Sequence, residues 1–259
     1  MLPDALLLSD GAEVTPDVLD GALQAKADAL NARFAHHSAS AVLDATLAQA
    51  VVGQTALVSS FGAESVALLH MVALINRATP VLFIDSQMLF AETLVYQQEI
   101  AERLRLENVR IIRAPSADLR QGDPNNDLHQ SDPDQCCALR KTVPLNTALG
   151  GFDSWITGRK RFQSGTRAQI EFFEVETGTR RIKVNPLAHW RSEDLLEYIQ
   201  ENRLPRHPLV SRGYPSIGCQ PCTTAVAPGE DPRSGRWRGQ EKTECGIHFV
   251  NGKPVRSGP

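Results

Sequence analysis

The sequence lacks several features that would assign it at once to a broad class. Its 259 residues hold no apolar run near the roughly 20 residues that span a bilayer. The first ten residues carry acid and no basic stretch, so we expect neither a membrane protein nor a secretory signal. The net charge of −3 gives no overall attraction for nucleic acid or an anionic membrane, so an anion site must be local.

Cysteine is also scarce, with only five in the chain. An odd number in close clusters is not typical of a secreted disulfide framework and favours metal or thiol chemistry in a reducing compartment, which we take to be the cytoplasm. Four of the cysteines form two close pairs, Cys136-Cys137 and Cys219-Gln220-Pro221-Cys222. The fifth, Cys245, stands apart, which indicates four thiolates for one metal centre and one free thiol.

Internal repeats and low-complexity tracts are absent, and the remaining pattern is strand and helix in alternation. Almost wholly apolar strands followed by helices predict an α/β fold, a parallel sheet covered by helices on both faces. We expect strands at 55–59, 80–84, 109–112 and 154–157, a hairpin at 170–176 and 181–185, helices at 15–34, 41–50, 65–76, 91–106, 135–149 and 192–202, and an irregular loop at 114–135.

The chain divides by composition into three parts. Residues 1–50 are a helical lead-in, residues 51–205 are the nucleotide-binding α/β domain, and residues 206–259 are rich in Pro, Gly, Arg and Cys. Because this tail has little apolar periodicity, we expect it to fold against the main domain. Ligands of such sheets bind at the carboxyl ends of the strands.

Neither a Walker sequence nor G-x-G-x-x-G is present, so a phosphate site must be built in another way. The turn after the strand at 55–59 leads into a helix and offers Ser60, Gly62 and Ser65. Backbone N–H groups, hydroxyls and the helix dipole can bind phosphate there. An ordinary βα turn is the competing interpretation, since many contain Ser and Gly.

Two basic clusters add to this signal. Arg159, Lys160, Arg161 and Arg167 follow the strand at 154–157, and Arg233, Arg236 and Arg238 precede Cys245. Either cluster alone could be a solvated loop. Guanidinium groups bind phosphate or sulfate through paired hydrogen bonds, so two clusters beside a phosphate-type turn favour an anionic nucleotide.

The paired cysteines leave three interpretations open: an iron–sulfur cluster, zinc, or a site without metal. Cys136 and Cys137 are adjacent, and helical neighbours point about 100° apart, which suits tetrahedral zinc poorly. A cluster with several iron corners accepts such a pair more readily. Arg140 and Lys141 each follow one cysteine by four residues, which places both cations on the thiol side of a helix.

Cys245 has Lys242 and His248 three residues away on either side and Gly246 directly after it. Cations lower the pKa of a thiol and so increase its thiolate fraction. Glu244 acts in the opposite sense, and an ordinary exposed cysteine is the competing interpretation.

Taken together, these residues resemble the sulfonucleotide reductases (the PAPS reductase superfamily), and among them the assimilatory iron–sulfur adenylyl-sulfate (APS) reductases. The resemblance covers about residues 55–248. Its specific parts are Cys136-Cys137-x-x-Arg140-Lys141, the distant Cys219-x-x-Cys222, the arginine loop Gly158–Ser164 and Glu244-Cys245-Gly246-Ile247-His248.

The resemblance implies an adenine-nucleotide α-hydrolase-like fold and a 4Fe–4S cluster on Cys136, Cys137, Cys219 and Cys222. It implies that Cys245 attacks the sulfur of APS, leaving AMP and an enzyme S-sulfocysteine, from which thioredoxin or glutaredoxin releases sulfite. The residues expected to bind the substrate are Ser60, Gly62, Ser65, Asp85, Ser86, Lys141, Arg159, Arg161, Gln163, Arg233, Arg236 and His248.

Two positions depart from the family pattern. Gln87 stands where Leu-Asp-Thr-Gly motifs have glycine, and Phe162 stands where an acidic residue is common. Because all four cluster cysteines are present, APS is the expected substrate, with its 3′-phosphorylated form, PAPS, as the second candidate. A tRNA-thiolating pyrophosphatase-type enzyme and a zinc-stapled binding module compete with this interpretation, and a homo-oligomer stays open.

Overall fold

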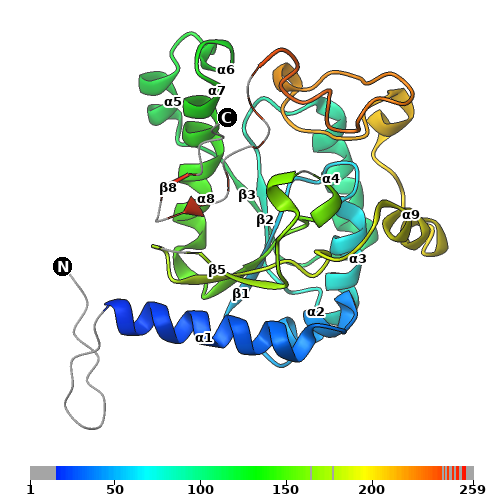
Figure 1. The fold of residues 1–259 in the computed structure, drawn as a ribbon. Coiled ribbons are helices and arrows are strands. Elements are labelled where there is room, and N and C mark those ends of the chain that lie inside the picture. Colours follow the sequence, from blue (N-terminus) through cyan, green and yellow to red (C-terminus); the bar gives the residue numbers. More distant parts are fainter. Residues whose placement is uncertain are drawn as a thin grey trace.

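A computed structural model describes residues 16–163, 165–176, 178–240, 242, 244, 247, 249–250 and 253–254. Its elements alternate in the expected manner (Figure 1). Helices are α1 Pro16–Phe34, α2 Ala39–Leu47, α3 Ser65–Ile75, α4 Ala91–Arg103, α5 Ser116–Gly122, α6 Leu128–Ser131, α7 Pro133–Cys137, α8 Val143–Ala148 and α9 Ser192–Glu201. Strands are β1 Thr55–Ser59, β2 Val81–Ile84, β3 Val109–Ile112, β4 Ser154–Ile156, β5 Phe173–Glu176, β6 Arg181–Val184, β7 Phe249–Val250 and β8 Lys253–Pro254.

Six strands form the central sheet in the order β3-β2-β1-β4-β6-β5. The pairs among β3, β2, β1, β4 and β6 are parallel, and β5 pairs with β6 in antiparallel fashion. The chain leaves β1 toward β2 on one side and later returns to place β4 on the other. The carboxyl ends of β1 and β4 therefore flank a switch point, where open α/β sheets bind ligands.

Each face of the sheet has its own core because side chains alternate along a strand. Leu57, Phe83 and Ile156 contact the core formed with α1, α2, α3, α4 and α9. On the opposite face, Val58 and Trp155 pack with Leu145 and Leu149 from the α8 region. Figure 1 shows α5 to α8 on one side of the sheet and α2, α3, α4 and α9 on the other.

The first helix closes the edge of the sheet at β5. Asn31 Nδ2 donates to the carbonyl of Phe173 at 2.8 Å, and the Phe173 N–H donates to Asn31 Oδ1 at 2.9 Å. The ring of Phe34 lies 5.9 Å from that of Phe173. This edge strand thus has a helix held against it by polar and apolar contacts.

Two expectations need correction. Residues 114–135, expected to be an irregular loop, contain α5, α6 and the start of α7. The strands are not all apolar either, since β6 buries Arg181 and Lys183. These cations are tolerated because both lie within 3.4 Å of the Glu176 carboxylate, and Lys183 Nζ lies 5.0 Å from the centre of the Trp155 ring.

The segment after α9 is tied to the sheet edge where the strands end. Leu209 and Ile217 pack with Ala63 and Phe90. Cys219 forms an antiparallel bridge with Leu89, beyond the end of β2. Within the described part of the chain, no helix has both the length and the apolar character required to cross a bilayer.

Candidate functional site

A cavity of about 300 Å³ opens at the switch point of the sheet. Its wall comes from the ends of β1 and β4, the start of α3, the loop after β4 and the segment 215–219. Eight residues predicted to bind substrate line it: Ser60, Gly62, Ser65, Lys141, Arg159, Gln163, Arg233 and Arg236. The cavity also reaches Cys219, so the predicted thiolate site adjoins it.

The turn from β1 to α3 is held in an unusual backbone conformation. Phe61 has φ 47°, in the left-handed region, and its N–H donates to Ser59 Oγ at 3.2 Å. A side chain at Gly62 would approach Ser60 Oγ to 3.3 Å and the Ile217 carbonyl to 3.4 Å. The loop thus lies close to the C-terminal segment and presents the start of α3 toward the cavity, and the N-terminus of a helix can bind an anion.

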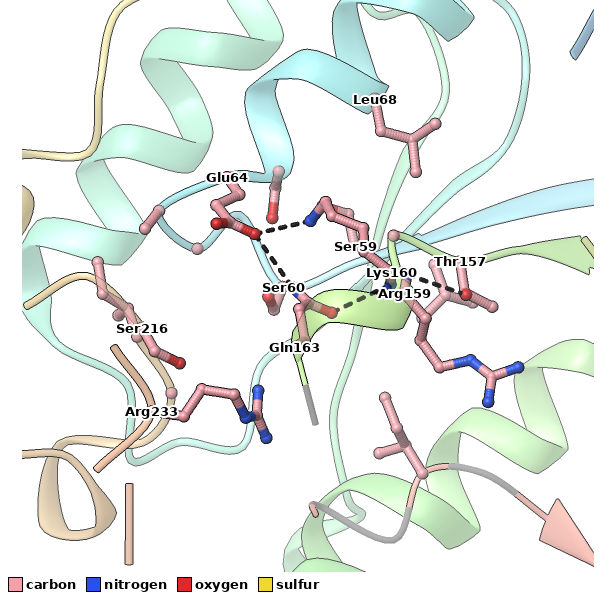
Figure 2. Close-up of a pocket in the computed structure, with 18 of the residues that line it drawn as sticks. Ser59, Ser60, Glu64, Leu68, Thr157, Arg159, Lys160, Gln163, Ser216 and Arg233 are labelled. Atoms are coloured by element: carbon pink, nitrogen blue, oxygen red, sulfur yellow. Dashed lines mark hydrogen bonds and ion pairs between the residues drawn. The ribbon is translucent and has the colours of Figure 1, made fainter. Parts of the chain in front are cut away.

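A buried lysine stands at the centre of the cavity wall (Figure 2). Lys160 Nζ donates to Glu64 Oε2 at 2.7 Å, and Gln163 Nε2 donates to the same oxygen at 3.0 Å. Burial lowers the pKa of Lys160, whereas the Glu64 carboxylate opposes that shift. The Glu64 charge is therefore turned toward the arginine loop, and in the described structure its carboxylate does not cap α3.

Arg159 is fixed by residues of the β5–β6 hairpin. Its guanidinium pairs with Glu174 and donates from Nε to Asn185 Oδ1 at 3.3 Å. Asn185 is fully buried and also accepts from Thr157 Oγ1 at 2.7 Å. Neither Asn185 nor Glu174 is among the site residues predicted from the sequence. A polar residue directly after a strand, as Asn185 is after β6, was the available signal.

The second basic cluster has one member tightly enclosed. Arg236 stacks on the ring of Trp237 at 4.4 Å and donates to Ser216 Oγ at 3.5 Å. A Cβ at Gly218 would lie 2.2 Å from Arg236 Nη2, so glycine makes this close approach feasible. Arg238 lies outside the cavity and pairs with Glu230 at 3.0 Å.

Three other predicted residues have side chains engaged outside the cavity lining. Arg161 donates to the Ile170 carbonyl at 2.8 Å and pairs with Glu171 at 2.9 Å. Asp85 pairs with Arg113 at 2.8 Å, and Ser86 Oγ lies 3.0 Å from Cys219 Sγ. These contacts assign Asp85 and Ser86 a place at the end of β2, next to the cysteines.

Gln87, which departs from the family glycine, has φ 60°. This left-handed conformation is the one that glycine adopts without strain. Its N–H donates to Asp85 Oδ1 at 2.8 Å, a local turn that stabilises the conformation for a residue with a side chain.

The two cysteine pairs are brought together from distant segments. Cys136, Cys137 and Cys219 are buried, and Cys222 is half-buried. Burial raises the pKa of Cys136 to about 11, with Arg140 lowering it and the thiolates of Cys219 and Cys222 raising it further. Ser86 links the two segments, because its Oγ lies 3.0 Å from Cys219 Sγ and its carbonyl accepts from Arg140 at 3.3 Å. All four of these cysteines are free of disulfides.

A π-helical segment, Ala138–Thr142, follows the first pair directly. This segment interrupts the regular α-helix expected at 135–149. The directions of the Arg140 and Lys141 side chains therefore do not follow from a spacing of four residues along an α-helix. Arg140 binds Asp123 and Asn126, each at 2.7 Å, and the Ser86 carbonyl at 3.3 Å. Lys141 reaches the cavity wall. π-segments occur frequently at functional sites.

Four cysteine thiols are the donor set that an iron–sulfur cluster takes. In the described part of the chain, no group of three or more His, Cys, Asp or Glu side chains is arranged around one metal position. Iron–sulfur clusters take four cysteine thiolates, each on its own iron, and so accept more widely spaced sulfurs. The donor set and its burial therefore fit a cluster.

Cys245 and His248, predicted as nucleophile and substrate ligand, lie outside the described residues, as do Gly246 and Ser164. Their neighbour Glu244 is described and lines the cavity. Three carboxylates in this wall, Glu64, Asp231 and Glu244, were not predicted as site residues.

Comparison with known proteins gives a consistent result. Residues 54–225 match the family model described as the phosphoadenosine phosphosulfate reductase domain. A protein named adenosine 5'-phosphosulfate reductase from Mesorhizobium japonicum is 45% identical over 230 residues, covering 89% of this chain and 90% of the relative. One of the same name from Chelativorans sp. (strain BNC1) is 47% identical over 235 residues, covering 90% and 94%.

Among solved structures, phosphoadenylyl-sulfate (PAPS) reductase from Candida auris aligns with a TM-score of 0.64 and 24% identity, over 83% of this chain and 99% of that one. At this identity the likeness concerns the fold. It confirms the expected adenine-nucleotide α-hydrolase-like sheet with helices on both faces and helices ahead of it.

Proposed function

Because the chain belongs to the phosphoadenosine phosphosulfate reductase family, we propose that it reduces adenosine 5′-phosphosulfate (APS) to sulfite and AMP. One observation carries the proposal: a cavity at the switch point of the sheet is lined by Lys141, Arg159 and Arg233 and reaches Cys219. The cationic wall, the predicted cluster site and Glu244, the residue before Cys245, meet in this cavity, which supports a thiol-dependent reaction on an anionic substrate.

In this proposal the turn between β1 and α3 binds the 5′-phosphate. Ser60, Gly62 and Ser65 supply hydroxyls and backbone N–H groups at the start of α3. Arg159, Arg233 and Arg236 stabilise the negative charge that builds on the phosphate as it leaves. Asp85, Ser86, Arg161 and His248 remain predictions without support from the cavity lining.

The proposed chemistry is a covalent, two-step transfer. The Cys245 thiolate attacks the sulfur of APS, an S–S bond forms, the S–O bond to phosphate breaks, and AMP leaves with that electron pair. A thiolate of an external dithiol then attacks Cys245 Sγ and releases sulfite. The second thiol of the dithiol resolves the mixed disulfide, so the reductant supplies both electrons and Cys245 is restored.

We propose thioredoxin, or the related glutaredoxin, as that dithiol, on the resemblance of the sequence. Free thiols on this chain need a reducing compartment, which supports the cytoplasm. We also propose that the chain divides into three parts, at residues 50 and 205. The last part packs on the nucleotide-binding domain.

A 4Fe–4S cluster on Cys136, Cys137, Cys219 and Cys222 completes the proposal. Burial of the thiols, their approach to one another and the cations Arg140 and Lys141 beside them support it. When bound, such a group adds fixed charge and a cross-link between α7 and the C-terminal segment. Lys141, which lines the cavity, connects that charge to the substrate.

Metal analysis of the purified protein decides between a cluster and zinc. We expect stoichiometric iron and acid-labile sulfide with broad visible absorption. A colourless protein with one zinc would reject the cluster and favour a zinc-stapled module.

Sulfite release from APS and from PAPS, measured in parallel with reduced thioredoxin, tests the substrate. The names of the family and of the Candida auris structure keep PAPS as the second candidate. We expect turnover with APS. Turnover with PAPS alone would transfer the proposal to that nucleotide, and sulfite from neither would reject it.

The substitution Cys245→Ser tests the mechanism. A serine hydroxyl is far less nucleophilic at neutral pH, so sulfite release should fall below detection while AMP binding stays within about twofold. The iron content should not change. Residual turnover near that of the parent protein would contradict the covalent step.

A further inference from the structure

Three described residues of the C-terminal tail contact three different parts of the structure, and two of them, Glu244 and Ile247, line the cavity. Lys242 forms an ion pair with Asp134, just before the first cysteine pair, and lies 5.7 Å from the centre of the Trp237 ring. Ile247 packs against the core between the sheet and α8, and it also lines the cavity. Glu244, between them, pairs with Arg167, which follows the arginine loop.

The Glu244 contact is the strongest of the three in geometry. Arg167 donates from Nε to Oε1 at 2.7 Å and from Nη2 to Oε2 at 2.6 Å. Arg233 adds a third contact at 3.5 Å. The side chains of Arg167 and Glu244 are only 12% and 17% exposed, so solvent and salt weaken this two-point ion pair less than a surface pair.

Arg167 is itself held by Gln163 of the arginine loop. Its Nη1 donates to Gln163 Oε1, and Gln163 Nε2 donates to Glu64 Oε2 at 3.0 Å. Glu64 directly precedes α3. A continuous series of side-chain bonds therefore joins the loop between β1 and α3 to Glu244 in the tail.

We propose that the Arg167–Glu244 pair is a positioning device for the adjacent Cys245. Successive Cα atoms are about 3.8 Å apart, so an ion pair that holds Glu244 would limit the distance over which the cysteine after it can move. The pair also cancels a carboxylate charge one residue from the thiol, which would otherwise disfavour the thiolate. The inference rests on the proposed function, since it assigns Cys245 the role of nucleophile.

The test is a double-mutant cycle on a single turnover. Glu244→Gln, Arg167→Gln and the double variant are mixed with APS without reductant, and S-sulfocysteine on the Cys245 peptide is followed by mass spectrometry. Misplacing a reacting group by about 1 Å can cost about 100-fold, so each single variant should slow the step by about 10- to 100-fold. The double variant should be no slower than the worse single one.

Equilibrium binding of AMP separates positioning from substrate contact. All variants should bind AMP within about threefold of the parent, since neither partner is assigned to AMP. Glu244→Asp, which keeps the charge, should recover part of the rate. The matched control is Glu230→Gln, which removes a similar pair with Arg238 outside the cavity and should leave the rate unchanged.

Three results would overturn the inference: single-variant rates within twofold of the parent, a double-variant loss equal to the product of the single losses, or AMP affinity falling in step with the rate. A faster Glu244→Gln with tighter AMP binding would also reject it, because Glu244 would then be a counter-ion that substrate displaces. If the parent forms no S-sulfocysteine, the proposed function fails instead. Hydrogen exchange of the tail peptide without substrate then tests the pair alone, and Glu244→Gln must accelerate it.

Discussion

Cations in the cavity wall are held by partners that lie far away in the sequence. Lys160 pairs with Glu64, 96 residues earlier, and Arg167 pairs with Glu244, 77 residues later. A buried cation without a partner costs several kcal/mol, so these carboxylates are as necessary to the wall as the cations are. The pairs fix the positions of these two cations in the wall of the cavity where an anionic substrate would be bound.

The close approach of Gly218 to Arg236 predicts an effect on nucleotide binding. In Gly218→Ala the new methyl group would overlap the guanidinium of Arg236, which must leave its place on the Trp237 ring. We expect AMP affinity to fall by about tenfold, because one charged hydrogen bond to the phosphate is lost. The melting temperature should change little. Calorimetric titration and thermal unfolding measure the two effects.

The control for this prediction is Gly150→Ala. A Cβ at Gly150 meets nothing within 4 Å, so both measurements should match the parent. Unchanged AMP affinity in Gly218→Ala would show that the position of Arg236 does not matter for binding.

The buried His207 predicts that the stability of the protein depends on pH. Its Nδ1 accepts from the Leu209 N–H at 3.2 Å and its Nε2 lies 3.0 Å from Thr93 Oγ1, so the buried ring is neutral. Burial lowers its pKa to about 4. As the pH falls from about 6.5 toward 4, His207 binds a proton in the unfolded chain but not in the folded one. The free energy of unfolding therefore falls by up to about 3 kcal/mol.

Urea denaturation across this pH range measures the effect. His207→Gln should be less stable at pH 7 but should lose less stability on acidification. His36→Gln, at an exposed position, should keep the slope of the parent. An equal slope in His207→Gln would show that other groups cause the acid sensitivity.

Residue types in the site could be predicted from the sequence, and their partners could not. Basic residues after β4 and serines after β1 are local signals, and eight of the predicted ligands line the cavity. The direction of a side chain depends on neighbours far along the chain. Arg161 is adjacent to Lys160 yet binds Glu171 instead, and nothing in the local pattern distinguishes the two.

The π-segment is the element that orients the cysteine helix. A π-turn contains one more residue than an α-turn, so it rotates Cys136 and Cys137 about the helix axis relative to α8. Leu145 of α8 is buried in the core. Arg140 can then bind Asp123 and the Ser86 carbonyl together. The segment thus joins the end of β2 to the loop ahead of α6.

Deleting Ala138 should convert this segment to a regular α-helix. The cysteines would rotate by about 100° relative to α8, away from Cys219. We expect iron content to fall several-fold and AMP affinity to decrease through Lys141, while far-ultraviolet circular dichroism stays close to that of the parent. Ala138→Gly, which preserves chain length, is the control and should retain iron. Full iron content in the deletion variant would contradict the role assigned to the segment.

Long elements were predictable because their apolar periodicity is regular. The strands at 55–59 and 109–112 have the expected bounds, and α4 begins at the expected residue. The helices α5 and α6 were missed because they have seven and four residues and bury no side chain. Short helices of this kind depend on tertiary contacts, and propensity over a few residues is a weak guide.

At the scale of the molecule, the sheet is protected on both faces and at its β5 edge. α1 covers that edge, and β5 with β6 in turn positions Glu174 and Asn185 against Arg159. The N-terminal helix α1 is therefore connected to the cavity wall through the hairpin of β5 and β6.

Asn31→Ala should weaken this docking. It removes two hydrogen bonds to the Phe173 backbone and leaves a buried carbonyl and N–H unpaired, which costs about 1–3 kcal/mol. Gln24→Ala, which removes only a local contact with Asp28 on the same helix, should change stability by less than about 0.5 kcal/mol. Denaturant unfolding compares the two. Equal losses would mean that α1 docks without Asn31.

Cys219 lies against Ser86, 133 residues earlier in the chain, and its backbone pairs with Leu89. During synthesis, the thiols of α7 therefore leave the ribosome before their partners are translated. The four sulfurs meet only after β2 has formed and the chain has been extended past Cys222. Any cofactor that bridges the pairs must be inserted after translation of that segment, and the nascent thiols must be kept reduced until then.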